Sequence, residues 1–284
     1  MREQAYTDDI HKTGVRDHRR PLKRCAMIPI GIAADFANLP EVHALGYDFV
    51  EVPLDELTAL SDSYFEEFVA WCEGCGVRVT AVNHILPGEL PIVGPDVSAT
   101  ALHDYLRRAF ERCRRLNVRV AVLDAALSRS VPAGYDYPMA WRQLGNFLRL
   151  AQGHARECGL AIAVEPLRKT ECNLLNLVSE ATLLAGLLQL GNVGVAANTG
   201  SMAMAAEPVS ALQQAGATLC HVHVENALTR RMPRDGDGED YRKLMRVLQQ
   251  IRYLGGVCVQ GRPGGDFALD ARAALLCLSQ AQRA

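Results

Sequence analysis

Short apolar runs alternate with amphipathic segments along almost the whole chain, and this alternation limits the folds open to it. The runs are rich in Val, Ile and Ala, and apolar side chains occupy nearly every position. Runs of this length and density are typical of parallel strands that are buried on both faces. They cover residues 28–34, 47–52, 77–83, 118–124, 160–165, 192–198, 218–224 and 256–260.

The segments between these runs predict helices. Residues 101–116 and 140–158 repeat apolar side chains with the i, i+3, i+4, i+7 spacing of a helix that buries one face. Eight strand–helix units in roughly 250 residues predict an α/β fold of the (β/α)8 TIM-barrel type. A doubly wound open sheet is the alternative, but the first run lacks the G-x-G-x-x-G turn typical of that fold. Further helices are expected near residues 39–45, 64–75, 177–190, 206–215, 240–252 and 267–280.

Residues 1–26 are polar without a regular period, so we predict an N-terminal extension followed by a single TIM-barrel domain over 27–284.

Charge and composition exclude several classes of protein. The 30 Lys and Arg residues against 32 Asp and Glu lack the basic excess of a nucleic-acid-binding protein. No apolar run approaches the ~20 residues of a membrane span, and the N-terminus has no apolar signal region. We therefore expect a cytoplasmic protein with neither nucleic acid nor membrane as a partner.

The nine cysteines do not predict a disulfide framework, because their number is odd and they are scattered. Cys72 and Cys75 form a C-x-x-C pair, but no second pair completes a zinc site. This pair lies at the end of a predicted helix, with Gly76 as the expected C-cap. A structural role is the expectation for both.

Polar residues gather where the predicted strands end. In a TIM barrel these carboxyl ends form the active site, so their side chains are expected to face one cavity. Each also has a structural explanation: Glu165 could cap a turn before a proline, and at least one of the two histidines is expected to lie in the core. A buried carboxylate needs a partner, however, which favours a functional Glu165. The set comprises Glu51, Asn83, His84, Asp124, Glu165, Asn198, His221, His223 and Gln260.

Five segments in order resemble those of the xylose isomerase-like TIM barrels, the sugar phosphate isomerase/epimerase family. The resemblance covers about residues 27–280, and the chain looks like a divergent member. The segments are VEPLRKTECNLLNLVSEA (164–181), VAANTGSM (195–202), HVHVEN (221–226), RRMPRDGDGEDY (230–241) and IRYLGGVCVQ (251–260).

This resemblance implies a divalent-metal site that is altered here. The family's Glu, Asp, His and Glu ligands fall on Glu165, Asn198, His223 and Gln260, so amides replace two carboxylates. Its two catalytic glutamates fall on Glu165 and Gln260, and an amide cannot take up a proton at neutral pH. We expect either no metal or a weakly bound Mn²⁺, Mg²⁺ or Zn²⁺. The resemblance and the strand ends together give Glu171, Arg230, Ser201, His84, Asp124 and His221 as candidate substrate-binding residues.

Three functions remain open. The favoured hypothesis is a barrel that binds a small sugar, polyol or sugar phosphate and whose metal-dependent activity is lost or altered. The alternative is an active isomerase or epimerase with atypical metal use, in which Glu165, Asp124 or His84 serves as a second acid or base. An endonuclease-IV-like DNA-repair enzyme is disfavoured, because it would need a three-zinc cluster and a basic groove. The family often forms pairs, so a homodimer is also an expectation.

Overall fold

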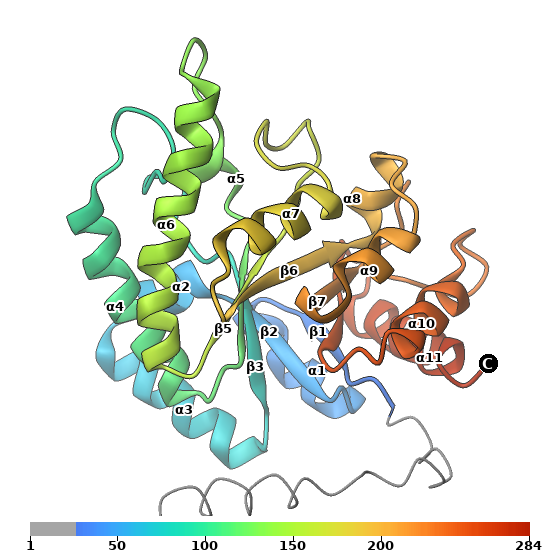
Figure 1. Cartoon of the computed structure of the whole chain (residues 1–284). Coiled ribbons are helices and arrows are strands. Elements are labelled where there is room, and N and C mark those ends of the chain that lie inside the picture. The colour runs from blue at the N-terminus through green and yellow to red at the C-terminus, as the bar shows by residue number, and fades with distance from the viewer. Residues whose placement is uncertain (1–26) are drawn as a thin grey trace, which may run out of the picture.

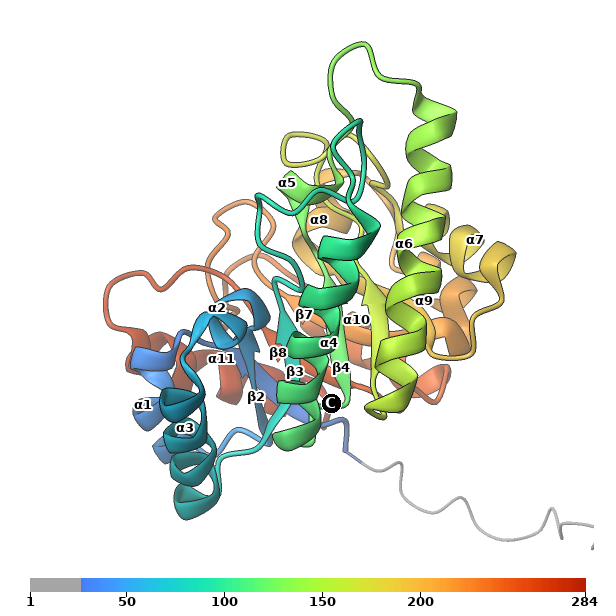
Figure 2. The same ribbon diagram turned by 90° about the vertical axis from the view of Figure 1, so that its left-hand side faces the viewer.

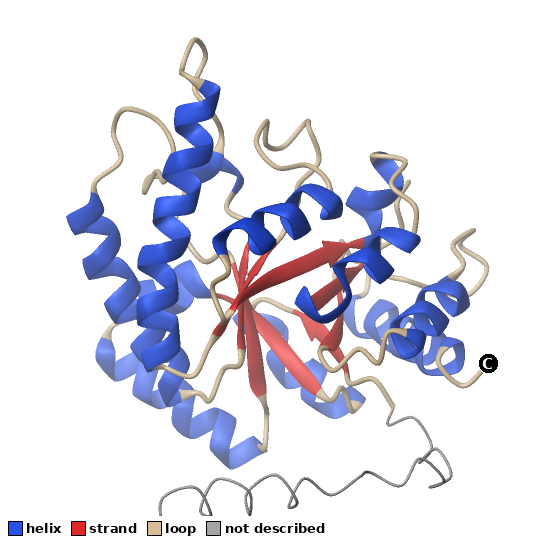
Figure 3. Cartoon of the chain, in the orientation of Figure 1, coloured by secondary structure: helices blue, strands red, loops and turns tan. Residues whose placement is uncertain are grey.

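The chain forms a closed barrel of eight parallel strands, with helices around the outside (Figures 1 and 3). The structure, a computed structural model, describes residues 27–284. Each strand pairs with the next in the sequence, and the last pairs with the first, which confirms the predicted TIM barrel. The strands are β1 (Ile30–Ala33), β2 (Phe49–Pro53), β3 (Val79–Asn83), β4 (Val120–Leu123), β5 (Ala161–Val164), β6 (Val193–Asn198), β7 (Leu219–Val224) and β8 (Gly256–Val259).

All the predicted helices form, close to their predicted bounds. They are α1 (Leu39–Leu45), α3 (Asp62–Cys75), α4 (Ala99–Arg115), α6 (Tyr137–Glu157), α7 (Val178–Leu188), α9 (Ser210–Ala215), α10 (Tyr241–Gln250) and α11 (Phe267–Ala281). Within the described residues, three short α-helices were not expected: α2 (Leu54–Ala59), α5 (Ala126–Arg129) and α8 (Thr199–Met204). Each of them comes soon after a strand, and segments this short carry no readable helical period. Figure 2 shows α5 and α8 toward the same end of the barrel.

Local capping explains several helix boundaries. The Ser98 hydroxyl accepts a hydrogen bond from the amide of Ala101 at the start of α4, and Asp136 caps α6 in the same way. Helix α3 ends at Gly76, whose φ of 71° is the left-handed conformation that a glycine C-cap favours. The predicted C-cap is thus confirmed, and the C-x-x-C pair lies in the last turn of α3.

The core has two parts that differ in character. Apolar side chains between the strands and the surrounding helices form one large buried cluster. Inside the barrel, apolar packing is confined to two small groups, one around Phe49 and one around Val122. Gly31 and Gly256 flank Phe49 because a Cβ at either position would collide with its ring. The rest of the interior is left to polar side chains.

The polar extension predicted for residues 1–26 lies outside the described residues. Within residues 27–284, no helix combines the length and apolar composition that crossing a bilayer requires.

Candidate functional site

The carboxyl ends of the strands bring the predicted polar side chains together inside the barrel. Successive residues of a strand face opposite sides, so residues two positions after the inward-facing Val122, Ala163 and Ala196 also face inward. Those residues are Asp124, Glu165 and Asn198. The buried polar side chains at or near this end of the barrel are Glu51, Asn83, Arg129, Glu165, Asn198, Ser201, His223, Glu225 and Asn226.

His223 lies at the centre of the site and is held between two carboxylates. Its Nδ1 lies 2.5 Å from Oε2 of Glu165, and its Nε2 lies 2.8 Å from Oε1 of Glu51. All three side chains are almost completely buried. Burial favours the neutral imidazole, but the two carboxylates outweigh it and raise the pKa of His223 well above its usual value. The imidazolium form therefore balances negative charge that would otherwise be buried without a partner.

The Glu51 carboxylate also contacts the second histidine of the strand-seven pair. Oε2 of Glu51 lies 2.7 Å from Nε2 of His221, whose side chain is 2% exposed. Burial favours the protonated acid, but His223 and His221 together lower the pKa of Glu51 below its usual range. His221 was expected to contact substrate; in the structure it is enclosed in the interior, and that role remains a prediction.

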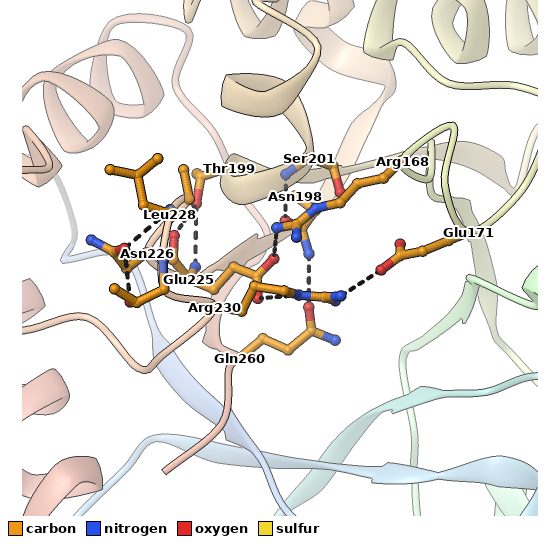
Figure 4. A network of polar contacts seen from close by, with 12 residues as sticks. Arg168, Glu171, Asn198, Thr199, Ser201, Glu225, Asn226, Leu228, Arg230 and Gln260 are labelled. Atoms are coloured by element: carbon orange, nitrogen blue, oxygen red, sulfur yellow. Dashed lines mark hydrogen bonds and ion pairs between the residues drawn. The ribbon is translucent and has the colours of Figure 1, made fainter. Parts of the chain in front are cut away.

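Asn198 and Gln260 face each other across the barrel and share a hydrogen bond (Figure 4). The Asn198 amide donates from Nδ2 to Oε1 of Gln260 over 2.8 Å. Its own Oδ1 accepts from the backbone amide of Ser201, which caps the N-terminus of α8. The Ser201 side chain is buried at this cap. Each of the two amides is therefore partnered by another group of the protein.

A network of ion pairs lies beside these amides (Figure 4). Arg168 donates to Oε1 of Glu225 over 2.5 Å, and Arg230 donates to Oε1 of Glu171 over 2.6 Å. Nε of Arg230 lies 3.8 Å from the other oxygen of Glu225, which links the two pairs. Gly200 makes room for the first pair, since a Cβ there would lie 2.5 Å from Oε1 of Glu225. Glu171 and Arg230, both candidate substrate contacts, are thus brought together at a partly exposed position.

Asp124 and His84 form a second titratable pair near the ends of β3 and β4. Oδ1 of Asp124 accepts from the backbone amide of His84 over 2.8 Å, and Nε2 of His84 lies 3.7 Å from Oδ2. Burial raises the pKa of Asp124 to about 6, although the nearby His84 acts to lower it. The His84 side chain is 56% exposed, and its φ of 44° places this residue in the left-handed region. A non-glycine residue in that conformation is often found at a functional site.

A sequence profile of the family described as the xylose isomerase-like TIM barrel matches residues 39–277. The chain belongs to this family. The resemblance expected from the five segments is therefore confirmed.

One known relative and two solved structures show what this xylose isomerase-like barrel is similar to. D-Psicose 3-epimerase of Ruminiclostridium cellulolyticum is 26% identical over 247 residues, which cover 82% of this chain and 81% of that protein. The structure of D-psicose 3-epimerase with D-tagatose from Clostridium cellulolyticum H10 superposes with a TM-score of 0.80 at 22% identity, covering 90% of this chain and 99% of that one. The structure of the IolI protein with a bound zinc atom gives a TM-score of 0.68 at 15% identity, covering 89% and 96%.

The four residues expected at metal-ligand positions, Glu165, Asn198, His223 and Gln260, are a poor fit to a divalent cation in this structure. Asn198 and Gln260 bond to each other, and both ring nitrogens of His223 lie against carboxylates. Of the four, only Glu165 has a carboxyl side chain, whereas hard cations such as Mn²⁺ and Mg²⁺ prefer several carboxylate oxygens.

Four residues of the site were missed by the sequence reasoning: Arg129, Arg168, Glu225 and Cys258. Arg129 is completely buried and donates to the backbone oxygens of Leu123 and Glu165, so it fixes the ends of β4 and β5. Glu225 could have been found, because it follows His223 by two residues and therefore faces the same side of the strand. Arg168 and Arg129 lie in loop and short-helix segments, where the sequence gives no periodic signal.

Proposed function

We propose that this protein binds a small sugar, polyol or sugar phosphate at the carboxyl end of the barrel, without the metal-dependent two-carboxylate chemistry of sugar epimerases. Membership of the xylose isomerase-like family and the overall likeness to a ketose epimerase support the ligand class. The amides at positions 198 and 260 support the change in chemistry. We also propose that the protein is cytoplasmic and binds no nucleic acid, and that it pairs as a homodimer.

The hydrogen bond between Asn198 and Gln260 is the observation that carries this proposal. Two carboxylates at a separation of 2.8 Å would repel each other unless a cation or a shared proton lay between them. Two amides at the same separation attract, because one donates and the other accepts. The pocket is therefore stable in this arrangement without a cation.

The groups around the amide pair match the needs of a polyhydroxylated ligand. Arg230 and Gln260 can donate to hydroxyl oxygens, while Glu171 and Asp124 can accept from hydroxyl groups. Arg230 is 44% exposed and Glu171 28% exposed, so both can be reached from solvent. An anionic group such as a phosphate would be drawn to the same arginine.

An active, metal-independent epimerase is the second candidate, and the Asp124–His84 pair is the observation that favours it. An acid with a pKa of about 6 exchanges protons readily near neutral pH. In this mechanism Asp124 takes a proton from the carbon beside the ligand carbonyl, and Glu165 returns one to the opposite face. Glu165, however, is engaged with His223, which makes it a poor proton donor to a ligand.

The test measures ligand binding and proton exchange in the same sample. The full chain, treated with a chelator, is titrated with D-psicose, D-tagatose, D-fructose and their phosphates by calorimetry. Exchange of ligand carbon-bound hydrogen is then followed by NMR in deuterated water. We expect binding without exchange, and Arg230→Gln should weaken binding at least tenfold while Arg142→Gln, an exposed position on α6, should leave it unchanged.

Two results would overturn the proposal. Absence of binding to every sugar and polyol would refute the ligand class. Exchange that needs no metal and disappears in both Asp124→Asn and Glu165→Gln would instead establish the epimerase.

A further inference from the structure

A second group of metal-binding side chains lies deeper in the barrel than the amide pair. It consists of Glu51 on β2, His221 and His223 on β7, and Cys258 on β8, and we call it the lower cluster. All four residues are at most 1% exposed. One ligand atom from each lies within 4.8 Å of those from the other three. The group therefore has the number of ligands and the compactness of a four-coordinate metal site.

The barrel geometry explains why these four side chains meet. His223 and Cys258 are direct partners in the parallel register of β7 and β8. Strand β1 lies between β8 and β2, and its register partners there are small: Gly31 beside Cys258, and Ala33 beside Glu51. With no large side chain from β1, the Cys258 thiol and the Glu51 carboxylate can approach across it.

Two polar atoms of the lower cluster have no hydrogen-bond partner among the described residues. Oε2 of Glu51 and Nε2 of His221 lie 2.7 Å apart, but their orientation does not make a hydrogen bond. Both atoms are fully buried and have no hydrogen-bond partner among residues 27–284. Buried polar atoms are almost always partnered, so two unpartnered atoms in contact point to a ligand that both could bind after a small separation.

The orientation of His223 is the one found in metal centres. A histidine ligand usually gives the N–H of its other ring nitrogen to a carboxylate, which fixes the ring and its tautomer. Here Nδ1 faces Glu165, and this leaves Nε2 directed at Glu51 within the lower cluster. Glu165, which stands at a ligand position of the family, thus becomes a positioning residue for His223.

We propose that Glu51, His221, His223 and Cys258 bind a Zn²⁺ ion in the barrel interior. A thiolate, two imidazoles and a carboxylate form a set that suits zinc better than Mg²⁺ or Mn²⁺. Cys258 binds as the thiolate and His223 through a deprotonated Nε2, and both protons are released to solvent. All four positions are filled by the protein, so the ion has a structural role and ties β2, β7 and β8 together.

Only small movements are needed to admit the ion. Zinc lies about 2.0–2.3 Å from nitrogen, oxygen and sulfur ligands, which puts tetrahedral ligands about 3.3–3.8 Å apart. The Glu51 oxygens are 2.7 and 2.8 Å from the two histidine nitrogens, and all four ligand atoms lie within 4.8 Å of one another, so the ligand atoms need to shift relative to one another by about 1 Å. A cavity of about 600 Å³ at the amino-terminal end of the barrel is lined in part by Phe49 and His221, so it borders the lower cluster.

The test uses Co²⁺ as a spectroscopic probe of the full chain after chelator treatment. Cobalt bound to Cys258 gives a sulfur-to-metal charge-transfer band, whereas cobalt at Glu165, Asn198, His223 and Gln260 does not, because that set contains no sulfur. We expect the band at one equivalent of Co²⁺ and its loss on competition with Zn²⁺. Saturating Zn²⁺, at about 100 times its dissociation constant, should raise the melting temperature by about 5–10 °C.

Matched variants decide which residues bind the ion. Cys258→Ser should abolish the band, while Cys220→Ser, which changes a β7 cysteine outside the lower cluster, should keep it. Glu51→Gln keeps the Cys258 thiol and should weaken Zn²⁺ binding at least tenfold. This second variant tests the proposal even if Cys258→Ser does not fold. No bound metal, or a band unchanged in Cys258→Ser, would overturn the proposal. Sugar binding is measured separately, so either proposal can fail without the other.

Discussion

Restoring both carboxylates should make the site unstable without a cation, and the structure sets the size of the effect. In the double variant Asn198→Asp plus Gln260→Glu, two carboxylates would face each other at about the 2.8 Å of the present hydrogen bond. Two ionised groups about 3 Å apart repel by about 5 kcal/mol at an effective dielectric constant of 20. The protein can escape by keeping one proton, which costs about 4 kcal/mol at pH 7 for an acid with an ordinary pKa near 4.3. The protein adopts the less costly of these two states. We therefore expect the two substitutions together to lower the free energy of unfolding by about 4 kcal/mol more than the sum of their separate effects.

Each single variant serves as a control. With one carboxylate, the remaining amide can turn to donate its N–H, so the contact stays attractive and stability should change by about 1 kcal/mol or less. The raised pKa of the shared acid makes the destabilisation largest at high pH, and it should shrink by about 1.4 kcal/mol per unit as the pH falls toward 4.

Urea unfolding of the four proteins at pH 5 and pH 7 in chelator measures this coupling as a double-mutant cycle. Mn²⁺ should then raise the free energy of unfolding of the double variant, whereas its presence at the amide pair should not change that of the parent protein. Additive single effects at pH 7, or a coupling that is the same at both values of pH, would show that positions 198 and 260 do not face each other.

Three further changes test other parts of the site. Gly200→Ala should cost about 1–3 kcal/mol, because its Cβ would displace the ion pair beside it, whereas Gly153→Ala on α6, with open space around it, should not destabilise; urea unfolding compares them. Glu51→Gln in chelator should cost about 3–5 kcal/mol in the same assay, because it removes a buried partner of His223, and a change under 1 kcal/mol would contradict the buried ion pair. Burial raises the pKa of Asp124 to about 6, so ionising Asp124 lowers the free energy of unfolding by an amount that grows from about pH 4 to pH 6 and is then constant. Asp124→Asn should lose this pH dependence. Parallel plots of unfolding free energy against pH for the two proteins would refute the shift.

The alternation of strands and helices could be predicted from the sequence because buried parallel strands and amphipathic helices each leave a local pattern. The strand-end residues Glu165, Asn198 and Gln260 could be placed as well, since the end of a strand fixes where its last side chain points. The short helices α2, α5 and α8 could not, because four to six residues span fewer than two helical turns and show no repeated spacing.

The partners within the site were beyond the reach of local patterns. Glu51 and His223 are 172 positions apart, and their contact exists only because the barrel closes. Cys258 looked like one more apolar residue of the last strand, and its closeness to Glu51 depends on the small residues of the strand between them. The bond between Asn198 and Gln260 likewise depends on the geometry of two strands that are not neighbours.

The cap of α8 links a side chain in the barrel interior to a backbone amide whose hydrogen exchange can be measured. The same Asn198 side chain that donates to Gln260 accepts from the amide of Ser201. A guest molecule that captures the Asn198 oxygen would release that amide proton to solvent. Its hydrogen-exchange rate is therefore a built-in reporter of occupancy, readable even if no reaction ever takes place.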